Sequence, residues 1–183
     1  MKKLTVVVIA LFMLNNCGYT PIYSSKNNIF YIDISQKDKS KLNSKIENIL
    51  EQNLLNIIYY ENSFAKAKFL TKTIEKWDIP TFYLDFDLLY SGYVKANVVP
   101  TLKNVTLLWP NSENLRENLE SIIEKISMTK SVVVIDSLNG FFNILKDDDA
   151  GMLINSFIMM LASSAKNTKS IILVGSLSKL NEE

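Results

Sequence analysis

The chain has no histidine, a single cysteine (Cys17) and a single arginine (Arg116) among its 183 residues. Without histidine, acid–base catalysis by imidazole and histidine metal sites are both excluded. One cysteine excludes an intrachain disulfide and a zinc site built from several cysteines. The formal net charge is only +1, so the composition gives no electrostatic argument for binding nucleic acid or an acidic surface.

The sequence does have enough apolar material for a core. Hydrophobic residues make up 48% of the chain and charged residues 21%, which is ordinary for a soluble globular protein. A length of 183 residues suits one domain, or one domain with an appendage.

The central pattern is KSVVVIDSLNGFF, over residues 130–142. Its β-branched run predicts a strand buried on both faces, which is typical of a central strand in a parallel sheet. Asp136 follows at the carboxyl end, where open α/β sheets place their ligand crevice. An alternative interpretation is that Asp136 begins a turn or caps the next segment.

Four more apolar segments predict strands, and they alternate with helical patterns. The predicted strands cover residues 54–60, 81–87, 105–109 and 170–175. Helices are predicted over about residues 63–77 and 150–165, and between these a third helix is capped at Asn111 or Ser112. The alternation predicts an α/β fold with a five-stranded, mainly parallel sheet flanked by helices.

The first 17 residues have the parts of an export signal. Lys2 and Lys3 give a positive start, and the apolar run over residues 4–14 is too short to span a bilayer as a helix. With Cys17 after it, the segment resembles a bacterial lipoprotein signal peptide. The resemblance implies that Cys17 becomes the lipidated first residue of the mature chain. The alternative is a buried amino-terminal strand.

The resemblance extends over about the first 55 residues. CGYTPIYSS from Cys17, the alternating strand FYIDIS at residues 30–35 and an amphipathic helix over about residues 37–53 look like the amino-terminal part of lipopolysaccharide-assembly lipoproteins. This implies a non-enzymatic outer-membrane lipoprotein. It would face the periplasm, anchored through Cys17, and act through a protein partner.

The stretch YENSFAKA at residues 60–67 stands where a P-loop ATPase has its phosphate-binding loop. Set against G-x-x-x-x-G-K-[ST], Lys66 occupies the position of the lysine that binds the outer phosphates. Tyr60 and Ala65 replace both glycines, and Ala67 replaces the hydroxyl that binds magnesium. The loop therefore departs from the consensus of a working phosphate-binding loop, because residues with side chains resist the positive φ that such loops use. Alternatively, Lys66 is a solvated lysine in the first turn of a helix.

The acidic strand ends add to this pattern, so that residues 54–176 resemble the RecA-type ATPases. FYLDFD ends in Asp85 and Asp87, and VVVIDS supplies Asp136 and Ser137. The resemblance implies a catalytic position at Asp87 and a Walker B position at Asp136, which holds the Mg²⁺ of bound ATP. It places Ser137 in the same motif. It also implies an order of the strands across the sheet: numbered by their position in the chain, they lie in the order third, second, fourth, fifth, first. Alternatively, Asp87 is an ordinary helix or turn cap.

Together these features predict a degenerate RecA-like nucleotide-binding domain, with ATP and Mg²⁺ as ligands and weak or absent ATPase activity. The lone Arg116 argues against self-sufficient catalysis, because phosphoryl transfer commonly uses an arginine to stabilise charge. The sequence leaves open whether an oligomer supplies the missing arginine. The alternative functions are the outer-membrane lipoprotein described above and an interaction scaffold without a ligand.

The two resemblances imply different compartments, since the periplasm holds no ATP pool. The apparent signal is then a strand or a membrane tether on a cytosolic protein, or the ATPase-like half is catalytically dead, or the sequence is a chimera joined near residues 53–56. We divide the chain into a signal segment (1–17), a peripheral strand and amphipathic helix (18–53), and a RecA-like α/β domain (54–183). We expect this last domain to be truncated at its carboxyl end.

Overall fold

The structure is a computed structural model that describes residues 39–52, 54–145 and 150–178. The signal segment, Cys17 and the strand expected at residues 30–35 lie outside the described residues. The helices are α2 (Lys39–Gln52), α3 (Ser63–Trp77), α4 (Leu89–Lys95), α5 (Leu115–Met128), α6 (Leu138–Ile144) and α7 (Ala150–Thr168). The strands are β1 (Leu55–Tyr60), β2 (Thr81–Asp85), β3 (Val105–Leu108), β4 (Val132–Asp136) and β5 (Ile171–Leu177).

The five strands form one sheet in the order β1-β5-β4-β2-β3. All four pairs of neighbouring strands are parallel, and β4 lies at the centre between β5 and β2. Both the predicted fold class and the predicted strand order are therefore confirmed.

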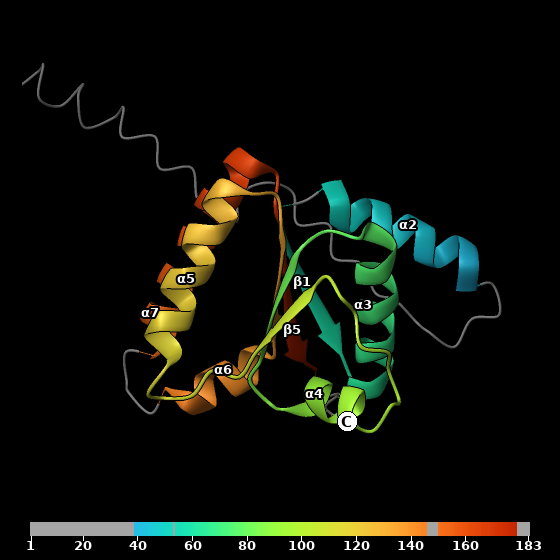
Figure 1. Cartoon of the computed structure of the whole chain (residues 1–183), viewed down its shortest axis with the longest axis horizontal. Helices are drawn as coiled ribbons and strands as arrows, with labels where there is room; N and C mark the ends of the chain where they lie inside the picture. Colours follow the sequence, from blue (N-terminus) through green and yellow to red (C-terminus); the bar gives the residue numbers. More distant parts are fainter. Residues whose placement is uncertain (1–38, 53, 146–149, 179–183) are drawn as a thin grey trace, which may run out of the picture. The chain divides into compact units, whose positions relative to one another are not determined.

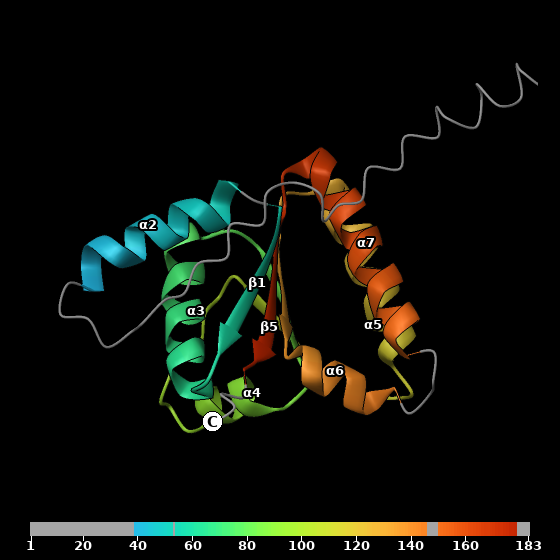
Figure 2. The same cartoon turned by 180° about the vertical axis from the view of Figure 1, so that it is seen from behind.

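Helices cover both faces of this sheet. Figures 1 and 2 show α5, α6 and α7 on one side and α2, α3 and α4 on the other. Val133 and Ile135 of β4 pack on the side of α5–α7, whereas Val132 and Val134 pack on the side of α2–α4. All four are 0% exposed. Burial on both faces explains why the β-branched run of β4 contains no polar residue before Asp136.

Most element boundaries agree with the sequence pattern, but two differences affect the site. β2 ends at Asp85, two residues earlier than predicted, so Asp87 lies in the loop that follows. The short helix α6 was not predicted. It begins because the side chain of Ser137 accepts a hydrogen bond from the backbone N–H of Gly140 at 3.1 Å.

Helix α2 packs against the α3 side of the sheet. Ile46 and Leu50 are buried in the same core cluster as the apolar residues of α3. At the end of the helix, the Asn56 side chain of β1 donates to the carbonyl of Leu50 at 3.1 Å. Within the ranges given above, none of the helices is both long and apolar enough to cross a membrane.

The close packing of α6 against the loop after β2 can be tested at Gly140. A Cβ at this position would lie 2.2 Å from Oδ1 of Asp87 and 2.9 Å from Cβ of Phe86. We expect Gly140→Ala to lower the free energy of unfolding by about 1–3 kcal/mol in urea denaturation, because the added methyl overpacks the contact.

Gly92 of α4 provides the matched control. Nothing lies within 4 Å of a Cβ built there, so Gly92→Ala should raise the free energy of unfolding by up to about 1 kcal/mol through helix propensity. Equal effects of the two substitutions would contradict the close contact between α6 and Asp87.

Candidate functional site

The acidic residues of β2 and β4 meet at the carboxyl edge of the sheet. Asp85 ends β2 and Asp136 ends β4, and the two are partners in the parallel register. Paired residues project from the same face of the sheet, and here it is the face that α3 and α4 cover. Asp85 is 0% exposed and Asp136 is 2% exposed. Two neighbouring carboxylates are thus held away from solvent.

β2 and β4 also mark the point where the connections of the chain reverse direction. β4 and β2 are neighbours in the sheet. The chain continues from β4 to β5, which lies on one side of this pair, and from β2 to β3, which lies on the other side. In open α/β sheets, ligands bind outside the carboxyl ends of two such neighbouring strands. The edge that carries Asp85 and Asp136 is therefore the candidate site.

Lys66 of α3 supplies a positive charge beside these carboxylates. Its ammonium forms an ion pair with Oδ1 of Asp136 and lies 3.8 Å from the centre of the Tyr60 ring. Only 4% of Lys66 is exposed, so the alternative of a solvated lysine is wrong. A buried ammonium requires such partners, because removing an unpaired charge from water is costly. The structure thus brings together two of the residues that the sequence assigned to one nucleotide site.

Tyr83 of β2 binds the other oxygen of Asp136. Its hydroxyl donates to Oδ2 of Asp136 at 2.5 Å, and its ring stacks on that of Tyr90 with centroids 4.0 Å apart. Burial raises the pKa of Tyr83 well above its ordinary value, and the charge of Asp136 raises it further. The phenol therefore stays protonated and acts as a donor. Sequence reasoning missed Tyr83, although its position two residues before Asp85 places both on one face of a strand.

Asp85 fixes the start of α4. Its carboxylate accepts hydrogen bonds from the backbone N–H groups of Ser91 at 2.7 Å and Tyr90 at 3.4 Å. Burial raises the pKa of Asp85 and the charge of Asp136 adds to this, while the hydrogen bonds from Ser91 act in the opposite direction. The N-cap of α4 is Leu88, which offers no capping side chain, so Asp85 satisfies donors that would otherwise lack a partner.

Asp87 and Ser137 form a second linked pair at the same edge. The hydroxyl of Ser137 donates to Oδ2 of Asp87 at 2.5 Å, and the peptide bond between Asp136 and Ser137 is cis. The interpretation of Asp87 and Asp136 as helix caps is wrong, because Ser137 is the N-cap of α6 and Leu88 that of α4. The predicted catalytic carboxylate thus contacts the motif that follows β4.

Only Glu61 and Asn62 connect β1 to α3. Asn62 is the N-cap of α3, and its side-chain oxygen accepts from the N–H of Ala65 at 2.9 Å. Since β1 ends at Tyr60 and the helix begins at Ser63, residues 63–67 of the stretch aligned with a phosphate loop form the start of a helix instead. Ala65 lies in the first turn of that helix, and Ala67 is buried in the core with 1% exposed.

The side chains around Asp136, as arranged, do not fit a magnesium ion. Mg²⁺ requires oxygen ligands in near-octahedral geometry, but one oxygen of Asp136 is bound by Lys66 and the other by Tyr83. In the described part of the chain, no three histidine, cysteine, aspartate or glutamate residues group so as to hold a metal ion. The cation beside Asp136 is a protein side chain.

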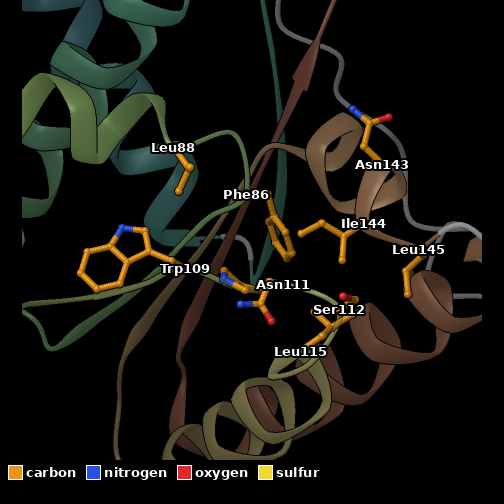
Figure 3. A pocket seen from close by; sticks show the side chains of 10 residues that line it. Phe86, Leu88, Trp109, Asn111, Ser112, Leu115, Asn143, Ile144 and Leu145 are labelled. Atoms are coloured by element: carbon orange, nitrogen blue, oxygen red, sulfur yellow. The ribbon is translucent and has the colours of Figure 1, made fainter.

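A pocket of about 720 Å³ lies next to the segment that holds Asp87. Figure 3 shows the indole of Trp109 on one side and Ile144 and Leu145 on the other. None of the ten lining residues carries a charge, so the pocket suits an apolar or amide-bearing group rather than a phosphate. The lining consists of Phe86, Leu88, Trp109, Pro110, Asn111, Ser112, Leu115, Asn143, Ile144 and Leu145.

Comparison with known proteins establishes the fold. The structure is similar to the crystal structure of the RadB recombinase, with a TM-score of 0.51, 14% sequence identity and coverage of 71% of this chain. The match spans 64% of the recombinase chain. No family model matches the sequence, and no curated protein matches it either. The chain therefore has a RecA-like fold, as the sequence of residues 54–176 predicted.

The raised pKa of Asp85 predicts a specific pH dependence of stability. The folded state holds the proton of this carboxyl more tightly than the unfolded state does. The resulting stability is present below the ordinary aspartate pKa of about 3.9 and is lost as the pH rises through the folded-state value. Asp85→Asn has no such titration, yet its amide oxygen can still accept from Ser91.

We therefore expect wild type to lose stability relative to Asp85→Asn as the pH rises above about 4. The free energies of unfolding of both proteins, from urea denaturation at several pH values, measure this difference. A difference that stays constant with pH would contradict a raised pKa at Asp85.

Proposed function

We propose that this chain is a nucleotide-binding domain of the RecA-like type, with weak or absent ATPase activity and ATP as the nucleotide. The observation that carries the proposal is the gathering of Lys66 and the strand-end residues Asp136, Ser137 and Asp87 at one edge of the sheet. In open α/β sheets, such an edge at a change of chain direction is where ligands bind.

The beginning of α3 supports phosphate binding at this edge. Helix N-termini favour anions because their first N–H groups lack intrahelical partners and the helix dipole is positive there. Lys66 lies in the first turn of α3 and carries the positive charge of the site. Affinity should be modest, because Asn62 already accepts from the N–H of Ala65 and Glu61 adds a negative charge nearby.

Two observations support weak or absent hydrolysis. Oδ2 of Asp87, which aligns with the catalytic acid, accepts a hydrogen bond from the hydroxyl of Ser137. Arg116 lies on α5, where its side chain is 90% exposed and pairs with Glu120 at 2.8 Å. Because α5 covers the face opposite α3, this chain offers no arginine of its own beside Lys66 to stabilise phosphoryl transfer.

Binding of ATP to the full chain, measured by calorimetry in EDTA and in MgCl₂, tests the proposal. We expect a dissociation constant on the order of 100 µM, and no release of phosphate above the buffer rate. Lys66→Gln should weaken binding by about 10-fold or more, because a hydrogen bond to a charged group is lost. Lys72→Gln, at an exposed position of the same helix, should leave it unchanged.

The cap of α3 offers a change in the other direction. Asn62→Gly releases the N–H of Ala65 for phosphate at a cost of only a few tenths of a kcal/mol in helix stability, and we expect tighter ATP binding. Asn111→Gly, which removes the side-chain acceptor before α5, is the matched control. No binding by folded wild type, or equal effects of the two glycine variants, would contradict the proposed site.

A further inference from the structure

We propose that Tyr60 is a gate over Lys66, and that its ring must turn away from the ammonium before a phosphate can reach this cation. The inference rests on the proposed binding of a nucleotide at Lys66, and it names the residue that controls access to that site.

The ammonium of Lys66 is closed off from solvent in the structure. Only 2% of its side chain is exposed. Asp136 contacts the ammonium through the ion pair, and the ring of Tyr60 covers it from another direction, with the ring centre 3.8 Å away. A phosphate oxygen must come within about 3 Å of the nitrogen to accept a hydrogen bond. One of these covering groups therefore has to move before a phosphate binds.

Asp136 is fixed more firmly than the ring of Tyr60. Its second carboxylate oxygen accepts from the hydroxyl of Tyr83 at 2.5 Å, and β4, which it ends, is paired with a strand on each side. The ring of Tyr60 meets Lys66 through a cation–π contact. In the part of the chain that the structure describes, no hydrogen bond fixes this ring. The ring is therefore the cover that can move.

The position of Tyr60 in the chain lets its ring turn outward. Tyr60 ends β1, and the residues on either side of it, Tyr59 and Glu61, are exposed. Its carbonyl accepts from the N–H of Ser178 at 2.9 Å. Because the side chain can change rotamer about its own bonds, the gate can open while this backbone hydrogen bond stays in place.

The sheet provides the closed position of the ring. A Cβ at Gly175 of β5 would lie 3.4 Å from Cε1 of Tyr60 and 3.6 Å from Oδ1 of Asp136. Since Gly175 has no side chain, the ring has room to reach the ion pair. Tyr60 itself stands where the consensus phosphate loop has its first glycine, and a glycine there would leave Lys66 uncovered on this side.

Binding of ATP and of inorganic triphosphate to the full chain, measured by calorimetry in EDTA, tests the gate. We expect Tyr60→Ala to bind both ligands about 10-fold more tightly than wild type, because a phosphate no longer has to displace the cation–π contact of a desolvated lysine. Triphosphate has no base, so an equal gain for the two ligands assigns the effect to the phosphates. Adding Lys66→Gln to Tyr60→Ala should abolish the gain.

Three further variants complete the comparison. Tyr60→Phe keeps the ring and should restore the weaker binding of wild type. Tyr59→Ala removes a side chain of the same strand that is 65% exposed and should leave binding unchanged. If circular dichroism shows that Tyr60→Ala is unfolded, Tyr60→Leu replaces it, because leucine keeps an apolar side chain but has no aromatic face.

Labelling of amines with acetic anhydride, followed by mass spectrometry, measures access to Lys66 in the absence of any phosphate. Lys66 should react several-fold faster in Tyr60→Ala than in wild type or Tyr60→Phe. Lys72, at an exposed position of α3, should react equally in all three proteins. Equal labelling of Lys66 in the three folded proteins would overturn the inference.

The calorimetric outcomes separate the gate from the proposed function. If wild type binds ATP and folded Tyr60→Ala binds no more tightly, or if the gain persists without Lys66, the gate is wrong and the nucleotide site stands. If only Tyr60→Ala binds, the gate is supported and nucleotide binding by wild type is wrong. If neither protein binds, both proposals are wrong.

Discussion

The buried ion pair between Lys66 and Asp136 is the interaction on which the arrangement of the site depends. Both side chains are almost fully removed from water, which is unfavourable for each charge alone. The hydroxyl of Tyr83 and the ring of Tyr60 complete the set of partners that makes burial tolerable. As a result the first turn of α3 is attached to the end of β4, and the edge of the sheet has one defined geometry.

That geometry separates two features that nucleotide hydrolysis needs together. The lysine that would reach a phosphate is directed at the carboxylate that would hold the metal ion. The acid that would polarise water is linked to Ser137. Each contact stabilises the folded chain and at the same time occupies a group that nucleotide hydrolysis would require. Under the function proposed above, this edge would bind a nucleotide while hydrolysing it weakly or not at all, because a shared fold does not fix the activity of its site.

The sequence predicted the fold better than it predicted the site. The existence of the five strands and the bounds of α3 followed from hydrophobic patterns, since buried parallel strands and amphipathic helices have distinct periods. The order of the strands in the sheet followed instead from the resemblance to the RecA-type ATPases. The burial of Lys66 could not be predicted, because a lysine in a first helical turn is usually solvated and only the spatial position of Asp136 explains it. Tyr83 was missed for the same reason: its role depends on the register between β2 and β4. The lipoprotein interpretation rests on about the first 55 residues, of which 1–38, with Cys17, lie outside the described residues. It stays a prediction.

A double-mutant cycle on the free energy of unfolding measures the Lys66–Asp136 pair most directly. Lys66→Gln, Asp136→Asn and the double variant would be compared with wild type by urea denaturation of the full chain. Each single change leaves a buried charge without its partner and should cost about 3–5 kcal/mol. The double change should cost less than the sum by about 2 kcal/mol or more. Effects that add to within about 0.5 kcal/mol would show that the two residues act independently, and the account of the site would be wrong.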